Sequence, residues 1–304
     1  MKDSFYKNLS IWGKILMVIC MILIVYSIYK KIAPRVEGFQ QNDDFIVKQG
    51  GDIYDDFYAD IYDQMLYSHQ KNNFEIGQII NETQLVNESI ILDVGCGTGN
   101  HVNILGLDGY NVTGVDISPA MIKKAKEYYP NFKYVVGDVM QTGQFSPESF
   151  THILCLYFSI YYFQNKDIFF KNATRWLKPG GYLIVHVVDR EQFDPILPAG
   201  NPLLLVSPQR YAKDRITKTS IIFNNMEYKA NFKLDQNKNI ATFEEKFTSK
   251  DNGRVRKNEH ILYMETDKQI LVRAQNAGFI YHGKIDLIKC GYEYQYLYIF
   301  MKPN

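Results

Sequence analysis

The sequence predicts an α/β fold built on a doubly wound, mostly parallel, seven-stranded sheet. Short apolar runs alternate with helical patterns from Ile90 to Val188, and a glycine-rich turn joins the first run to the first helix. A last helix and two apolar runs follow near the C-terminus. Alternating strands and helices place helices on both faces of a parallel sheet, and 304 residues suffice for such a domain and an added element.

The alternation begins abruptly at residue 90. Its strands are predicted at residues 90–94, 111–115, 132–136, 151–158 and 182–188. Its helices are predicted at residues 100–107, 118–129 and 166–177. Ser118 followed by Pro119 gives the second helix an N-cap and a first-turn proline. Residues 90–190 are therefore predicted to form the core of the domain.

Residues 191–265 interrupt this alternation and predict an inserted antiparallel β element. Four β-like runs separated by Asn, Asp and Gly turns cover residues 216–223, 227–234, 240–248 and 254–264. Residues 266–304 return to the core, with a helix over 268–276 that ends at Gly278 and strands near 279–285 and 295–301.

The N-terminal residues 1–32 predict a transmembrane helix that anchors the chain in a membrane. Residues 11–29 are apolar or weakly polar except for Lys14, which makes about 19 residues against the roughly 20 that cross a bilayer as a helix. A cleaved signal peptide is the alternative, but no small-residue cleavage site follows.

Two further segments precede the core. Residues 33–52 combine Pro, Gly, Asn and Asp without periodicity and predict a linker. Residues 53–89 predict a helical segment, in which Tyr54, Tyr58 and Tyr62 recur every fourth residue and share one face.

Composition and charge exclude several classes of protein. The 34 Lys and Arg residues nearly balance 33 Asp and Glu, so no nucleic-acid partner is expected. The four cysteines have neither the spacing nor the histidine partners of a zinc site, and no metal is expected.

The stretch from Leu92 to Gly99, Leu-Asp-Val-Gly-Cys-Gly-Thr-Gly, carries the chemistry. A strand enters a turn with three glycines, and a helix begins directly after it. Residues without side chains let a ligand approach the backbone, and the helix N-terminus offers free N–H groups. Asn100 stands where the third glycine of the dinucleotide-binding Gly-x-Gly-x-x-Gly motif would fall, which argues against a dehydrogenase.

This stretch resembles the first motif of the class I S-adenosylmethionine-dependent methyltransferases, which have a Rossmann-like fold. The resemblance continues to Asp116, where the family binds the ribose hydroxyls, to Val136-Gly-Asp-Val139, where an acid lies near the adenine, and to Leu177-Lys-Pro-Gly-Gly-Tyr-Leu-Ile184. These motifs cover residues 90–188, about a third of the chain. The resemblance implies S-adenosyl-L-methionine as cofactor, bound by Tyr62, Asp93, Gly95, Cys96, Gly97, Gly99, Asp116, Ile117, Met121, Gly137, Asp138, Val139 and Leu156.

Candidates for the reacting centre follow the fourth and fifth strands. His186 suits a general base because its unperturbed pKa lies near neutrality, and Tyr157, Tyr161 and Tyr162 lie at or just after the end of the fourth strand. A structural role is the alternative for His186, as it is for Asp93 within its strand. The fourth strand lacks the Asp/Asn-Pro-Pro-Tyr motif of amine-modifying enzymes and the Pro-Cys nucleophile, so Cys155 is interpreted as a core residue.

The resemblance implies a methyltransferase that acts on an N or O atom of a small molecule. In related enzymes the helical segment forms a lid over the cofactor, and the insertion lies where a substrate cover is built. The alternatives are methylation of a lipid or membrane-associated protein, and a non-catalytic cofactor-binding membrane adaptor. A single-pass membrane protein with its domain facing the cytosol is expected, because the cofactor is made there and no disulfide framework is evident. The acceptor and the oligomeric state stay open.

Overall fold

The computed structural model describes residues 10–32, 43–196, 208–223 and 225–304, and the chain divides into two compact units, Met1–Gly38 and Phe39–Asn304. The described part of the first unit is helix α2 (Ile11–Ile32), at the position of the predicted anchor. Within the described residues, no helix is both long and apolar enough to cross a bilayer. The predicted transmembrane anchor is therefore not supported.

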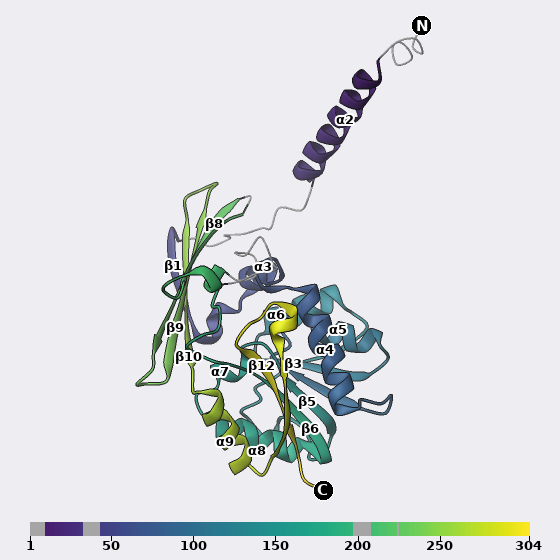
Figure 1. Ribbon diagram of the computed structural model, residues 1–304, viewed down its shortest axis with the longest axis vertical. Helices are drawn as coiled ribbons and strands as arrows, with labels where there is room; N and C mark the ends of the chain where they lie inside the picture. Colours follow the sequence, from purple (N-terminus) through teal and green to yellow (C-terminus); the bar gives the residue numbers. More distant parts are fainter. Residues whose placement is uncertain (1–9, 33–42, 197–207, 224) are drawn as a thin grey trace. The chain divides into compact units, whose positions relative to one another are not determined.

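The second unit contains the predicted seven-stranded sheet, in the order β11-β12-β6-β5-β2-β3-β4 (Figure 1). The four neighbouring pairs among β2 to β6 are parallel, whereas β12 is antiparallel to both β6 and β11. The mostly parallel sheet predicted from the sequence is confirmed. The strands are β2 (Ile90–Val94), β3 (Asn111–Asp116), β4 (Lys133–Val136), β5 (Phe150–Cys155), β6 (Leu177–Val188), β11 (Ile280–Asp286) and β12 (Gln295–Met301).

Helices cover both faces of this sheet. Along β2, Ile91 packs into one apolar cluster and Leu92 into the other, because successive side chains of a strand point to opposite faces. The first cluster takes residues from α4 (His69–Thr83), α5 (Asn100–Leu107) and α6 (Pro119–Tyr128), and the second from α7 (Ser159–Tyr162), α8 (Lys166–Trp176) and α9 (Asp267–Asn276).

Local signals explain where these helices begin. The Ser118 hydroxyl accepts a hydrogen bond from the Met121 N–H at 3.1 Å, and Pro119 occupies the first turn of α6, as predicted. Helix α9 begins with a capping box between Thr266 and Gln269. Strand β5 ends at Cys155, earlier than the predicted residue 158, because Tyr157 has a φ of 55° that no strand accommodates.

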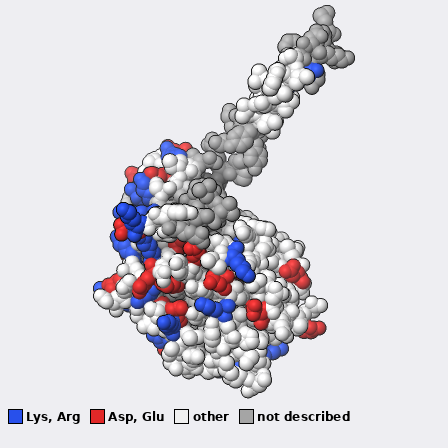
Figure 2. Space-filling view, viewed as in Figure 1, with Lys and Arg blue, Asp and Glu red and all other residues white. Residues whose placement is uncertain are grey.

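The insertion forms a second, five-stranded sheet in the order β1-β10-β9-β8-β7. Its strands are β1 (Phe45–Gln49), β7 (Lys218–Ile222), β8 (Met226–Asp235), β9 (Ile240–Ser249) and β10 (Val255–Tyr263), and β7 to β10 are antiparallel as predicted. Buried Tyr228 and Phe232 alternate with outward-facing Lys229 and Lys233 along β8. Acidic and basic side chains gather over this sheet in Figure 2.

The linker predicted over residues 33–52 is wrong at β1, which pairs in parallel with β10 from Phe45 opposite Val255 to Gln49 opposite Glu259. This edge strand alternates half-buried with exposed residues, and its partner lies about 210 residues away, which left no local signal. The helix η1 (Gly50–Ile53) and α3 (Asp56–Leu66) follow it. The rest of the predicted linker, residues 33–42, lies outside the described residues.

Candidate active site

A cavity of about 730 Å³ lies where β2, β3 and β4 end, and residues following these strands form one of its walls. Ligands of open α/β sheets bind outside the carboxyl ends of the strands. Of the predicted cofactor-binding residues, those that line the cavity are Tyr62, Gly95, Gly97, Asp116, Ile117, Met121, Gly137, Asp138 and Val139.

The glycine turn leaves space that side chains would fill. Gly95 and Gly97 have φ values of 67° and 53°, in the left-handed region that favours glycine. A Cβ atom on Gly95 would lie 2.5 Å from the Ser159 hydroxyl, and one on Gly97 would lie 3.5 Å from the Tyr62 ring. The space above Gly97 is therefore bounded by the aromatic ring of Tyr62 and by bare backbone.

Asp116, at the end of β3, faces this turn. Its carboxylate oxygens accept hydrogen bonds from the N–H groups of Gly97 at 3.0 Å and Ser118 at 2.9 Å. Burial raises the pKa of Asp116, while these backbone donors oppose that shift. Each oxygen retains acceptor capacity for a ligand hydroxyl, so the residue fits the ribose-binding role.

The loop after β4 completes this wall of the cavity. The Gly137 N–H donates to the Asp116 backbone oxygen at 2.9 Å, and the Asp138 carboxylate accepts from the Met140 N–H at 2.9 Å. Asp138 lines the cavity one strand beyond Asp116, and Met121 lines it from α6. The residues present therefore fit S-adenosylmethionine.

Helix α3 belongs to the segment predicted to form a lid, and hydrogen bonds join it to residues of the glycine turn and α5. Asp63 accepts hydrogen bonds from Thr98 at 2.7 Å and from Asn100 at 3.0 Å, while the Ser118 hydroxyl donates to the Tyr54 backbone oxygen at 2.6 Å. These bonds hold α3 against the glycine turn, and they hold Tyr54, just before α3, against the start of α6.

Four predicted cofactor residues lie behind the cavity wall: Asp93, Cys96, Gly99 and Leu156. A Cβ atom on Gly99 would lie 2.7 Å from the Tyr134 hydroxyl and 3.1 Å from Ala125, so this glycine permits close packing. Asp93 is 1% exposed, and burial raises its pKa to about 6. These four residues pack behind the glycine turn. That they contact the cofactor stays a prediction.

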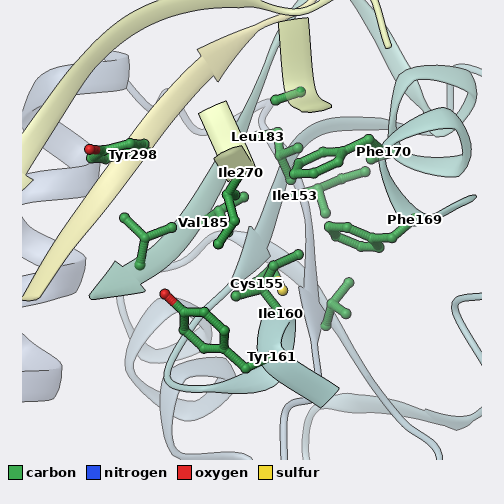
Figure 3. Packing of buried hydrophobic residues seen from close by; sticks show 14 of the residues in the cluster. Ile153, Cys155, Ile160, Tyr161, Phe169, Phe170, Leu183, Val185, Ile270 and Tyr298 are labelled. Carbon is green, nitrogen blue, oxygen red and sulfur yellow. The ribbon is translucent and has the colours of Figure 1, made fainter. Parts of the chain in front are cut away.

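Among the catalytic candidates, Tyr161 does not line the cavity. It is fully buried among Cys155, Ile160 and Val185 (Figure 3), and its hydroxyl accepts a hydrogen bond from the Val188 N–H at 2.8 Å. Tyr161 is therefore a core residue, as is Cys155. Sequence alone could not show that the short helix α7 turns this side chain away from the cavity.

His186 and Tyr157 line the cavity, but their polar atoms are occupied. One ring nitrogen of His186 bonds the Tyr157 backbone oxygen and the other meets the Gln295 side chain at 3.1 Å. Burial lowers the pKa of His186 to about 4, and the Tyr157 hydroxyl donates to the Leu66 backbone oxygen at 3.1 Å. This geometry favours a structural role for His186, holding the left-handed turn at Tyr157, over the predicted role as a base.

The other half of the cavity is an aromatic chamber. Its walls come from α3, α7 and the inner face of the five-stranded sheet, and they include Tyr54, Tyr58, Tyr162, Phe193, Phe232, Phe243, His260 and Leu262. Among the described lining residues there is no Lys or Arg. The sequence prediction missed His260 and Glu245 behind it. The sequence signal that could have indicated this site is a polar residue at every second position of β10, namely Arg256, Asn258 and His260, which share its inner face.

The fold and the site resemble those of the class I S-adenosylmethionine-dependent methyltransferases. Residues 92–185, about a third of the chain, match the family model of the methyltransferase domain.

Curated relatives are similar to this chain over part of their length. The chain is 37% identical over 99 residues to a 2-methyl-6-phytyl-1,4-hydroquinone methyltransferase of Synechocystis, covering 31% of this chain and 30% of that one. It is 30% identical over 140 residues to a dTDP-4-amino-2,3,4,6-tetradeoxy-D-glucose N,N-dimethyltransferase of Saccharopolyspora spinosa, covering 44% and 55%. The chain thus spans only between about a third and just over half of these relatives.

A solved structure shares the fold over a greater length. An S-adenosylmethionine-dependent methyltransferase from Clostridium acetobutylicum superposes with a TM-score of 0.61 at 17% identity, covering 81% of this chain and 98% of that one.

Proposed function

We propose that this protein is an S-adenosylmethionine-dependent methyltransferase that transfers a methyl group to an N or O atom of a small molecule. The observation that carries the proposal is the single cavity that joins the glycine turn and Asp116 to the aromatic chamber. An acceptor in the chamber would meet the cofactor within one cavity, as an in-line displacement requires.

The bound cofactor would supply an electrophilic methyl group on a sulfonium. The chain's own residues bind and orient it: the glycine turn accommodates the methionine part, Asp116 the ribose, and Asp138 the adenine. Tyr62 lies between the glycine turn and the chamber, 3.5 Å from the position of a Cβ atom on Gly97. With the rest of α3, Tyr62 would cover the reacting centre and exclude water.

The chamber favours a flat acceptor without negative charge. Aromatic rings offer large apolar contact area, whereas a nucleoside diphosphate requires Lys or Arg donors that the described lining does not provide. The Saccharopolyspora relative is named for a nucleotide sugar and the Synechocystis relative for a hydroquinone. The chamber of this chain resembles what a ring such as a hydroquinone requires.

The cytosolic placement of the domain remains a proposal. It is supported by the four free cysteines, which form no disulfide in the structure. Protease protection on intact cells tests it: a domain that resists external protease until detergent is added supports the proposal, and digestion before any detergent is added would contradict it.

The function is tested by incubating the full chain with methyl-labelled cofactor and three pools: small molecules including hydroquinones and dTDP-amino sugars, lipids, and proteins. Label in the small-molecule pool supports the proposal. Label only in lipid or protein would favour the corresponding alternative, and tight cofactor binding without any transfer would favour a non-catalytic adaptor. Asp116→Asn serves as the control for transfer that depends on this site.

A further inference from the structure

A buried carboxylate lies at the back of the aromatic chamber. Glu245, on β9, is 1% exposed and is bonded on both oxygens. One oxygen accepts from the hydroxyls of Tyr228 at 2.9 Å and Tyr58 at 3.2 Å, and the other lies 3.1 Å from the Asn258 amide and 2.8 Å from His260 Nε2. Burial alone would raise the pKa of Glu245, but His260 and these donors outweigh it and lower the pKa.

Since Glu245 stays a carboxylate, it can only accept hydrogen bonds, and this determines the tautomer of His260. Nε2 carries the proton that is donated to Glu245. When the ring is neutral, Nδ1 holds a lone pair and can accept the hydroxyl of Tyr162, whose oxygen lies 2.9 Å away. The three residues form a chain from Glu245 through His260 to Tyr162.

This hydrogen-bonded series of three residues lies along the cavity wall. Tyr162 lines the cavity from α7, which follows β5, and His260 lines it from β10. The ring of Tyr54 packs edge-on against both Tyr162 and His260, with centroids at 6.0 and 6.1 Å. Tyr58, on α3, contacts both His260 and Tyr62. Tyr62 in turn lies beside the glycine turn.

We propose that Tyr162, His260 and Glu245 form a proton relay that removes the proton from an aromatic hydroxyl of the acceptor. The proposal rests on the methyltransferase function above and names its acceptor class. A catalytic chain of acid, histidine and hydroxyl is suited to deprotonation, because the carboxylate orients the imidazole and stabilises the imidazolium.

The acceptor oxygen forms a bond to the transferred methyl carbon while the carbon–sulfur bond breaks, and its electron pair stays on sulfur, which becomes a neutral thioether. The acceptor proton passes to the Tyr162 oxygen as the Tyr162 proton passes to Nδ1 of His260. The resulting imidazolium is paired with Glu245 and releases its proton to solvent after the product leaves.

A hydroxyl is the group that needs this relay. A neutral amine can attack a methyl group with its own lone pair and lose its proton afterwards, whereas a hydroxyl attacks well only as its anion. The apolar and aromatic walls around the relay are suited to the ring that would carry that hydroxyl.

The relay can be tested with 4-nitrophenol, whose anion absorbs visible light, bound to the full chain in the presence of saturating S-adenosylhomocysteine. The ionisation of the bound dye is followed as pH changes, so the readout does not depend on turnover. In the wild type we expect the apparent pKa of the bound dye to fall by about one unit or more, because its proton moves onto the relay. In His260→Gln and Glu245→Gln it should return toward the value in free solution.

Two further variants separate the relay from a purely structural network. Tyr162→Phe keeps the ring and removes only the hydroxyl, so the dye should bind with an unshifted pKa. His152→Gln is the matched control, since His152 is a buried histidine that stacks on Tyr182 outside the cavity, and it should retain the wild-type shift. Imidazole nitrogen resonances should show Nδ1 of His260 without a proton in the wild type.

Each outcome bears on one claim. An unshifted pKa for the dye bound to the wild type, or an equal shift in His260→Gln, would overturn the relay. Cofactor binding without dye binding would overturn the aromatic hydroxyl as acceptor. Failure to bind S-adenosylmethionine in calorimetry would instead contradict the proposed function itself.

Discussion

Replacing Asp116 by Asn tests the cofactor site without changing the shape of the side chain. The carboxylate already accepts the N–H groups of Gly97 and Ser118, one on each oxygen, and would accept the two ribose hydroxyls on its remaining lone pairs. The amide keeps one oxygen and places an NH2 group opposite a backbone donor. One charged hydrogen bond to the ribose is thereby lost.

A hydrogen bond to a charged group contributes about 1.5–3 kcal/mol, so the dissociation constant for S-adenosylmethionine should rise about 10- to 150-fold. Titration calorimetry of the full chain measures this, with thermal unfolding as the check that the variant is folded. Asp108→Asn, an exposed acid after α5, is the matched control and should bind as the wild type does. Equal affinity in the folded Asp116 variant would refute the ribose contact.

Three further changes have distinct expected results. Gly97→Ala and Gly109→Ala both place a side chain at positive φ and should each lose about 1–2 kcal/mol of unfolding free energy. Only Gly97→Ala should weaken cofactor binding, since a Cβ on Gly109 meets open space. Equal binding of the cofactor by the two variants in calorimetry would contradict the site. Burial raises the pKa of Asp93 to about 6, so the folded state holds its proton longer than the unfolded state does, and the stability this adds at low pH is lost as pH rises through about 6. Denaturant unfolding of Asp93→Asn should therefore gain up to about 3 kcal/mol on the wild type between pH 4 and pH 7, and a pH-independent difference would count against the shift. Arg256→Gln breaks two hydrogen bonds to Asp55, the N-cap of α3, so limited proteolysis should cut near α3 faster and the cofactor should dissociate faster, whereas unchanged rates would show that this pair does not hold the lid.

The sequence predicted the parts of the fold that local patterns determine. Strand β2, the glycine turn and Asp116 could be placed because a period change, φ requirements and strand ends are all written within a few residues. The mostly parallel arrangement of the strands followed from the same alternation. The cofactor half of the cavity was therefore largely predictable.

The acceptor half was not predictable, because it is built from contacts that are distant in the chain. Glu245 and His260 meet Tyr162 only after β9 and β10 pair and pack against α7. His186 lies in a strand whose two faces are both covered, so its complete burial left no trace in the local pattern. Strand β1 likewise depends on its pairing with β10, and a fragment starting at Gly50 would lose it.

The most direct test of the account is a calorimetric titration of the full chain with S-adenosylmethionine and, in parallel, with NAD. The glycine turn, the two acids and the lid predict saturable binding of S-adenosylmethionine at one site and no comparable binding of NAD. Tighter binding of NAD, or no binding of S-adenosylmethionine by the folded chain, would contradict the central claim.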